Sequence, residues 1–385
     1  MSLHKAYITA SSLWCHFGND AQALGDSLRT LTPLAYETYV KEHLAEKPYY
    51  HFQENFDSEE EKLYTTLDTI VQQVINQTGL SEEECREVAI FIGSTAMGIS
   101  LNEAHYAHFL EHTKTTPFNH LGYGYLGTYL EKRLGSKHKA LLFSTACTSS
   151  VNALAYASKM IERGVIQKAL VVGIELFNRT TYNGFSSLML LSKNNLYRPF
   201  DERSDGIILG ESCSALLLEN QPRTAHDFYY KGSKNQCDIY SETTSNPSGV
   251  PIFETMNGAL ENAKLDLHAI DIIKAHATGS ENNNTSEANA LHLLFEKYAI
   301  QKPITALKPL LGHTLGASGS NEIALSLLCA KEGFIPPAYG FETPAEGVRF
   351  EPLRTPFTCK DKPLSILFNF VAFGGNTTSL ILARD

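Results

Sequence analysis

Cys147 lies where a thiol could act as a nucleophile. It follows the apolar run Ala140–Thr145 and opens a stretch of small residues that predicts a helix over 148–163. At a helix N-terminus a thiol meets unpaired N–H groups and the positive end of the helix dipole, and both favour the reactive thiolate. A buried core cysteine is the alternative, but polar neighbours favour a reactive role: Ser144, Thr145, Thr148, Ser149 and Ser150.

Two of the fourteen histidines lie in turns rich in small residues. His276 ends an apolar run and is followed by Ala-Thr-Gly-Ser, and His313 has glycines on both sides. Such turns present a side chain into a cleft. Neither histidine has a partner at the spacing of a metal site, so we expect no metal. A cysteine with two distant histidines suits acyl transfer, in which the thiol attacks and N–H donors or a base meet the developing charge.

Short apolar runs, expected to be strands, alternate along the chain with longer segments that are expected to be helices. This alternation predicts an α/β fold with buried sheets. Residues 176–206, which have poor periodicity and many turn-forming residues, are expected to be a loop. The expected strands are Ala6–Ala10, Val88–Ser94, Ala140–Thr145, Lys168–Glu175, Cys213–Glu219, Ile270–His276, Leu364–Phe370 and Thr378–Ala383. The expected helices cover about 20–30, 59–78, 102–112, 148–163, 254–264, 285–298 and 319–333.

The two halves of the chain resemble each other. Each contains a strand that ends in a small polar turn and continues into a helix, once at Cys147 and once at His276. We therefore expect an N-terminal half over 1–222, with the cysteine, and a C-terminal half over 223–385, with both histidines.

Composition narrows the class of protein. With 43% hydrophobic residues and a net charge of −10, the chain is expected to be globular and to disfavour nucleic acid and anionic membranes. No apolar run is long enough to span a membrane, and the N-terminus lacks the pattern of a secretion signal. Seven scattered cysteines without a close pair predict free thiols and a cytoplasmic location.

These motifs together resemble those of the β-ketoacyl-acyl-carrier-protein synthases, decarboxylating condensing enzymes of the thiolase fold. STACTSS around Cys147 is similar to their nucleophile motif, and KAHATGSENNNTSE and LKPLLGHTLGASGSNE resemble their two histidine motifs. GFSSLMLLS with RPFDERSDGIILGE resembles the central block, and FGGN the glycine loop. The resemblance implies two similar α/β halves in a layered α-β-α-β-α core.

The resemblance also implies roles for individual residues. Cys147 would carry the acyl chain, and His276 and His313 would act on malonyl. The oxyanion hole would be the backbone N–H groups of Cys147 and Phe373. The residues expected to support this set are Lys308, paired with Glu322, and Thr278 and Phe373 beside the pocket. Outside these motifs, Thr116–Tyr125 is expected to form part of the acyl tunnel and of the dimer contact.

Several positions depart from the family pattern. Ala277 and Ala372 stand where the family usually has glycine, and Asn284 stands where it has aspartate. These differences favour a specialised fatty-acid, polyene or polyketide pathway over housekeeping elongation. The histidine pair, by resemblance, favours decarboxylative elongation over the initiating enzymes and the thiolases.

Three functions remain open at this point. A synthase that condenses malonyl with a Cys-bound chain is favoured. A chain-length-factor-like partner subunit is the alternative, although such subunits generally lack the cysteine, and a thioesterase or simple acyltransferase would not need both histidines. The resemblance implies an acyl carrier protein as partner, a homodimer or a heterodimer with a paralogue, and no cofactor beyond the carrier's phosphopantetheine arm.

Because the bulk charge is negative, an acidic carrier needs a local basic surface. Lys193, Arg198 and Arg203 flank the expected entrance loop and are the first candidates. The second candidate surface is Lys132, Arg133, Lys137 and Lys139.

Overall fold

The computed structural model describes residues 4–20, 24–25, 28, 39–42, 45–111, 122, 124–194 and 196–385. Two sequence predictions lie largely outside these residues: the helix at 20–30 and the tunnel segment Thr116–Tyr125.

The first half of the chain builds five strands in the order β5-β4-β6-β8-β1. The strands β4, β5 and β6 are parallel, whereas β8 is antiparallel to both β6 and β1. Nearly every residue of β4, β6 and β8 is buried, which is why they appear in the sequence as continuous apolar runs. Their bounds are β1 Tyr7–Trp14, β4 Val88–Gly93, β5 Leu141–Phe143, β6 Lys168–Glu175 and β8 Ser212–Glu219.

The second half repeats this pattern in the order β11-β10-β14-β15-β9. Again three strands are parallel, and the last two are antiparallel to their neighbours. Tyr7 and Ile8 pair with Tyr229 and Phe228, so the two half-sheets join into one ten-stranded sheet. The bounds are β9 Phe228–Cys237, β10 Ile272–Lys274, β11 Ile304–Thr305, β14 Leu364–Val371 and β15 Asn376–Arg384.

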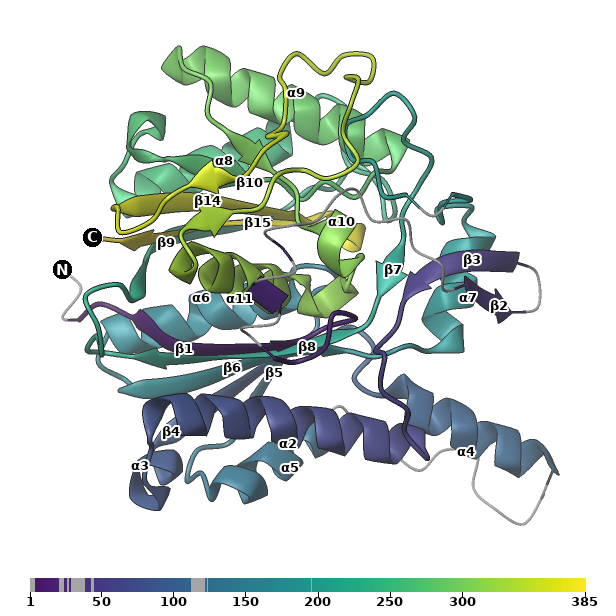
Figure 1. The fold of residues 1–385 in the computed structure, drawn as a ribbon, viewed down its shortest axis with the longest axis vertical. Coiled ribbons are helices and arrows are strands. Elements are labelled where there is room, and N and C mark those ends of the chain that lie inside the picture. The colour runs from purple at the N-terminus through teal and green to yellow at the C-terminus, as the bar shows by residue number, and fades with distance from the viewer. Residues whose placement is uncertain are drawn as a thin grey trace.

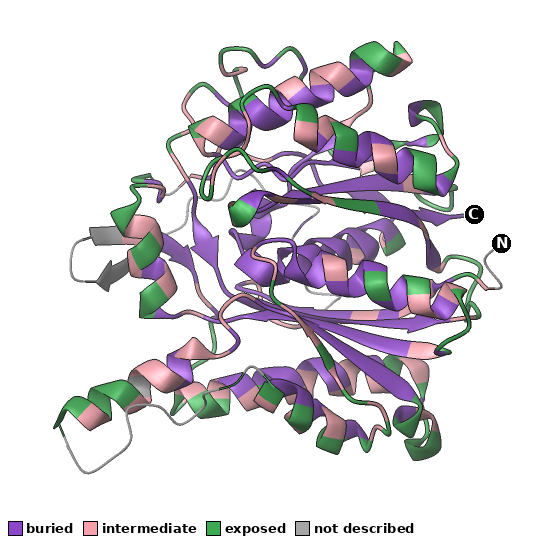
Figure 2. Cartoon of the chain, turned by 180° about the vertical axis from the view of Figure 1, so that it is seen from behind, coloured by how far each residue is buried: buried purple, intermediate pink, exposed green. Residues whose placement is uncertain are grey.

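Helices form three layers around the half-sheets. Figure 1 shows α6 (Ser149–Glu162) and α11 (Ser318–Lys331) between the two half-sheets, with α2 (Glu59–Thr78) on one outer face and α8 (Val250–Ala263) and α9 (Glu281–Tyr298) on the other. Figure 2 shows the strands buried along most of their length and the outer helices exposed on their solvent faces. This is the predicted α-β-α-β-α arrangement.

The remaining elements are shorter or peripheral. They are β2 Tyr39–Glu42, β3 Ala45–Tyr50, α3 Glu82–Arg86, α4 Ile99–Glu111, α5 Gly124–Leu134, α7 Arg179–Ser187, β7 Leu209–Gly210, α10 Lys308–Leu311, β12 Phe334–Ile335 and β13 Phe357–Thr358. In the described part of the chain, no helix is both long and apolar enough to cross a membrane.

All eight predicted strands are present, and six of the seven predicted helices lie within a few residues of the predicted bounds. The prediction of a continuous loop over 176–206 is wrong, because Asn178 caps the helix α7 by accepting from the N–H of Thr181. The prediction also missed α5 and β9. The strand β9 carries polar residues where it passes the glycine loop, and these hide its strand pattern. The boundary between residues 222 and 223 stays a prediction.

Candidate active site

Cys147 lies in the turn between β5 and α6. The preceding residue, Ala146, has a φ of 50°, which turns the chain sharply before the helix begins. The hydroxyl of Ser149 holds this turn, accepting from the Thr145 N–H and donating to the Ala146 carbonyl at 2.6 Å. The Cys147 side chain is buried, and its Sγ lies 3.2 Å from Nε2 of His313.

The helix N-terminus does not by itself produce a thiolate here. Burial raises the pKa of Cys147 to about 12, against the lowering effect of Lys308 and of the backbone N–H groups of Phe373 and Cys147. The backbone N–H groups at the helix terminus lower this pKa, as expected, but desolvation outweighs them. These two N–H groups therefore lie close enough to the sulfur to stabilise negative charge on it.

His313 is held by the backbone on both sides of its turn. Its N–H donates to the Ile208 carbonyl at 2.7 Å, and its carbonyl accepts from the Gly210 N–H at 3.2 Å. Gly312, with a φ of 72°, supplies the left-handed conformation before it. The ring is therefore fixed with Nε2 toward Cys147 and Nδ1 3.2 Å from the Ser318 hydroxyl.

His276 is held by a buried carboxylate. Glu287, on α9, accepts from the N–H of His276 at 2.6 Å and from that of Ala277 at 2.7 Å. Asn369 and Asn283 also donate to this carboxylate. The turn after β10 is thus anchored to α9, and it places the His276 ring 5.5 Å from the ring of His313.

Both histidines are neutral at physiological pH. Burial, followed by the nearby Lys308, lowers the pKa of each ring well below its ordinary value of 6.5. Lys308 Nζ lies 3.3 Å from His276 Nδ1. Because an ammonium can only donate, His276 Nδ1 accepts, and its proton is on Nε2.

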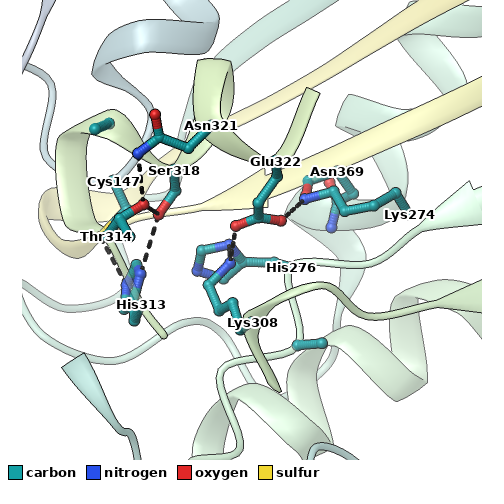
Figure 3. A network of polar contacts seen from close by, with 12 residues as sticks. Cys147, Lys274, His276, Lys308, His313, Thr314, Ser318, Asn321, Glu322 and Asn369 are labelled. Carbon is teal, nitrogen blue, oxygen red and sulfur yellow. Dashed lines mark hydrogen bonds and ion pairs between the residues drawn. The ribbon is translucent and has the colours of Figure 1, made fainter. Parts of the chain in front are cut away.

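Glu322 joins two buried lysines behind the histidines (Figure 3). Its Oε1 lies 2.7 Å from Lys308 Nζ, and its Oε2 lies 2.6 Å from Lys274 Nζ. The predicted pair of Lys308 and Glu322 is present. Lys274, which also donates to the Asn369 carbonyl at 3.0 Å, was not predicted. In the sequence Lys274 is only the polar end of the short apolar strand β10, which gives no signal of its role.

Glu175 is a second residue that the sequence analysis missed. At the end of β6 its buried carboxylate accepts from the Ser94 hydroxyl and from the N–H groups of Thr95, Ala96 and Gly316. It therefore ties the loop after β4 to the loop that carries His313. In the sequence it is a glutamate ending an apolar strand, which is a pattern with many structural explanations.

A cavity of about 310 Å³ opens onto the three predicted catalytic side chains. Cys147, His276 and His313 line it together with Thr278, another predicted site residue. Phe373 also lines the cavity, and its ring stacks on that of Phe185 with centroids 5.5 Å apart. An aromatic pair thus stands in the wall next to the thiol.

The three departures from the family pattern have different geometries. Ala277 has a φ of 51°, a conformation that glycine adopts more easily. Ala372 has a φ of −139°, which any residue adopts. Asn284 Oδ1 accepts from the Phe200 N–H at 3.1 Å, as an aspartate oxygen would. Of these three residues, Ala277 is the one whose backbone conformation is strained.

The first predicted carrier surface lies near the cavity, although one of its cations is paired. Ser204, Asp205 and Gly206 line the cavity and adjoin the predicted residues. Arg203 is ion-paired with Asp201 at 2.7 Å and with Glu342 at 2.8 Å. Lys193 is exposed, and Arg198 is half-buried. The charge of Arg203 is thus largely neutralised, and a carrier would meet mainly Lys193 and Arg198.

The second candidate surface does not adjoin this cavity. None of its four residues, Lys132, Arg133, Lys137 and Lys139, lines the cavity, and three of them are ion-paired with Asp68, Glu87 and Glu131.

Comparison with known proteins agrees with this arrangement. Residues 52–223 match the family model of the β-ketoacyl synthase N-terminal domain, and residues 229–342 match that of the C-terminal domain. The chain belongs to the β-ketoacyl synthase family. Synthases of this family are condensing enzymes of the acyltransferase type, and the resemblance seen in the sequence is confirmed.

Curated β-ketoacyl synthases are distant relatives of this chain. The tetracenomycin polyketide synthase ketoacyl synthase alpha subunit of Streptomyces glaucescens is 27% identical over 262 residues, 65% of this chain and 61% of that protein. The 3-oxoacyl-acyl-carrier-protein synthase 2 of Coxiella burnetii is 27% identical over 252 residues, 62% and 60% of the two chains. The match thus spans about three fifths of the length of these two relatives.

Solved structures of ketosynthases share the fold over nearly the whole chain. A β-ketoacyl synthase from Burkholderia phymatum aligns with a TM-score of 0.83 at 21% identity, covering 100% of both chains. A chain of the ketosynthase complex with its chain length factor from Xenorhabdus doucetiae aligns with a TM-score of 0.80 at 23% identity, covering 99% and 98%. The predicted thiolase-like fold is confirmed.

Proposed function

We propose that this chain is a β-ketoacyl-acyl-carrier-protein synthase. It would join a Cys147-bound acyl chain to malonyl carried on an acyl carrier protein, with loss of CO₂. The observation that carries the proposal is the convergence of a buried thiol and two neutral imidazoles on one cavity. A thioesterase or simple acyltransferase would leave the second imidazole without a task.

The first step moves the acyl chain onto the enzyme. Cys147 sulfur attacks the thioester carbonyl of the acyl-carrier, the bond to the pantetheine sulfur breaks, and the thiol proton ends on that sulfur. Because the pKa of Cys147 is raised to about 12, the thiol gives up its proton only as the reaction proceeds. The N–H groups of Cys147 and Phe373 stabilise the tetrahedral oxyanion.

The second step makes the carbon nucleophile. The C–C bond between malonyl and its carboxylate breaks, CO₂ leaves, and negative charge gathers on the thioester oxygen. His276 and His313, both neutral, each direct an N–H to that oxygen. Removing one such donor typically costs ~10²–10³ in rate. The carbanion then attacks the thioester carbonyl on Cys147, the C–S bond breaks, and Cys147 leaves as a thiolate that takes up a proton from solvent.

Lys308 and Glu322 support this chemistry from behind the histidines. Lys308 contacts Nδ1 of His276, away from the reacting atoms, and its ammonium is paired with Glu322. It therefore orients the ring and does not act as a base. Thr278 borders the path of the phosphopantetheine arm, and Phe373 gates the acyl side of the cavity. The reaction calls on no metal or cofactor apart from that arm.

The partners and setting follow from the same proposal. An acyl carrier protein docks beside Lys193 and Arg198, and the pathway is a specialised fatty-acid, polyene or polyketide system. The chain acts in the cytoplasm as a dimer, with itself or with a ketosynthase paralogue. Solved relatives include a ketosynthase in complex with its chain length factor and another in complex with an acyl-carrier protein, which supports both kinds of partner.

The test is detection of the acyl-enzyme. The purified protein is incubated with a panel of acyl-carrier proteins, and the intact mass is measured for the wild type and Cys147→Ala. We expect an acyl adduct on the wild type alone, and the panel reports the preferred chain length. If the wild type acquires acyl groups only when a second synthase subunit is added, or never, the partner-subunit alternative is favoured.

A further inference from the structure

Four buried polar side chains form a line that ends at the catalytic thiol (Figure 3). Asn321 Nδ2 lies 3.1 Å from Thr314 Oγ1, which lies 3.4 Å from Ser318 Oγ. Ser318 Oγ lies 3.2 Å from His313 Nδ1, and His313 Nε2 lies 3.2 Å from Cys147 Sγ. All are at most 6% exposed, so water does not compete for these contacts.

The contacts allow hydrogen bonding to run in one direction along this line, from Asn321 toward His313. An amide NH₂ can only donate, so the Thr314 oxygen accepts from Asn321 and the Thr314 hydroxyl proton is free to donate to Ser318. With Thr314 as donor to Ser318, the Ser318 hydroxyl proton is available to Nδ1 of His313. A ring nitrogen that accepts carries no proton in the neutral imidazole, so this direction would put the proton of His313 on Nε2.

The second histidine reaches the same state by another route. Nδ1 of His276 faces the ammonium of Lys308 at 3.3 Å, which also forces the proton onto Nε2. Around His313, the charged or titratable neighbours are Cys147, His276, Lys308 and Lys274. In the described part of the chain, the side chain within hydrogen-bonding distance of His313 Nδ1 is the neutral hydroxyl of Ser318.

We propose that Ser318, oriented by Thr314 and Asn321, is a positioning residue that fixes His313 as the Nε2–H tautomer. The His313 N–H then points to the Cys147 sulfur and, once malonyl is bound, to its thioester oxygen. The contact of this N–H with the malonyl thioester rests on the proposed function, whereas the tautomer assignment does not. At His276 the ammonium of Lys308 sets the tautomer. A lysine in the place of Ser318 would add a positive charge beside the thiol, whereas the neutral hydroxyl sets the tautomer without added charge.

The tautomer is read directly by ¹⁵N NMR of protein with ring-labelled histidine, with His313→Gln to assign the resonances. We expect wild-type His313 to be protonated on Nε2 and unprotonated on Nδ1. In Ser318→Ala the two forms should become mixed, and in Thr314→Val the same change should be smaller. Ser326→Ala is the matched control, because this buried hydroxyl of the same helix donates to the Glu322 carbonyl and not to His313.

The outcome that overturns the proposal is a wild-type His313 protonated on Nδ1, or a tautomer that Ser318→Ala leaves unchanged. Steady-state decarboxylation of malonyl-carrier gives the second readout. Ser318→Ala should lower kcat by ~10-fold and leave KM within about twofold, since the donor matters in the transition state. An unchanged kcat would overturn the role in catalysis. If the tautomer shifts as expected but the wild type never decarboxylates, the proposed function fails and the tautomer assignment stands.

Discussion

Cys147 Sγ lies 3.2 Å from Nε2 of His313, although the two residues are 166 positions apart in the chain. Cys147 belongs to the first half of the fold and His313 to the second. The helices α6 and α11, packed together between the half-sheets, fix this distance from both sides. The site therefore depends on the interface between the halves, where α6 packs against α11.

Alkylation of Cys147 should depend steeply on pH. Because burial raises the pKa of this thiol to about 12, the protonated form dominates at neutral pH. Its reaction with iodoacetamide should accelerate ~10-fold per pH unit from about pH 7 to about pH 9. Peptide mass spectrometry measures the rate, with the exposed Cys237 as internal reference. A rate that is high and flat over this range would mean that the thiolate already exists at rest.

Replacing Glu322 should destabilise the fold. Glu322→Gln leaves Lys274 and Lys308 buried without their shared counter-charge, a change that costs about 3–5 kcal/mol for a buried pair. Burial lowers the pKa of Lys274 to about 8 although Glu322 raises it, so in the variant this lysine loses its charge at a lower pH and the penalty should shrink as pH rises toward about 8. Urea unfolding at two pH values measures both effects.

The matched control is Glu351→Gln, which breaks an exposed pair with Arg354. Exposed pairs are worth about 0–1 kcal/mol, so this variant should unfold close to the wild type. Equal stabilities of the two variants would contradict the account of the lysine cluster.

Glycine should stabilise one departure from the family pattern and not another. Ala277 has a φ of 51°, a conformation that costs a non-glycine residue about 1–2 kcal/mol. Ala277→Gly should therefore raise the free energy of unfolding by about 0.5–1 kcal/mol after the entropy cost of glycine is subtracted. Ala372→Gly, at a φ of −139°, should lower it by a similar amount. Chemical denaturation of both variants measures these changes. A lower free energy of unfolding in both variants would contradict the strain argument.

Charge reversal should separate the two candidate carrier surfaces. Arg198→Glu is expected to raise the apparent KM for carrier-bound substrates several-fold at low salt and to weaken its salt dependence. Lys132→Glu on α5 is the control and should leave both unchanged. Arg203 is unsuitable for this test, because reversing it places a carboxylate against Asp201 and Glu342. If the apparent KM instead responds to Lys132→Glu and not to Arg198→Glu, the carrier docks at the second candidate surface.

How far the sequence predicted the site depends on how each residue acts. Cys147, His276 and His313 stand in short motifs whose small residues are visible in sequence, and the structure brings all three together. Lys274 and Glu175 could not be recognised, because each looks like an ordinary end of a buried strand and gains its meaning from a partner far along the chain. That the pKa of Cys147 is raised could not be foreseen for the same reason, since burial is a property of the folded core.

The elements show the same contrast. Strands buried on both faces, such as β6 and β8, are continuous apolar runs and were found from sequence. The strand β9 is half polar, and α7 depends on one capping residue in a segment rich in turn-formers. Both need the tertiary structure to be recognised.

The most direct test of the central claim separates decarboxylation from condensation in Cys147→Gln. The glutamine amide imitates the acyl thioester, while His276 and His313 remain to stabilise the charge on malonyl. Mass spectrometry of the carrier measures acetyl-carrier formed by loss of CO₂, beside the β-ketoacyl product, for this variant, the wild type and His313→Ala. We predict CO₂ loss without product for Cys147→Gln and neither for His313→Ala, a loss of ~10²-fold or more. Condensation by either variant at the wild-type rate would contradict the account.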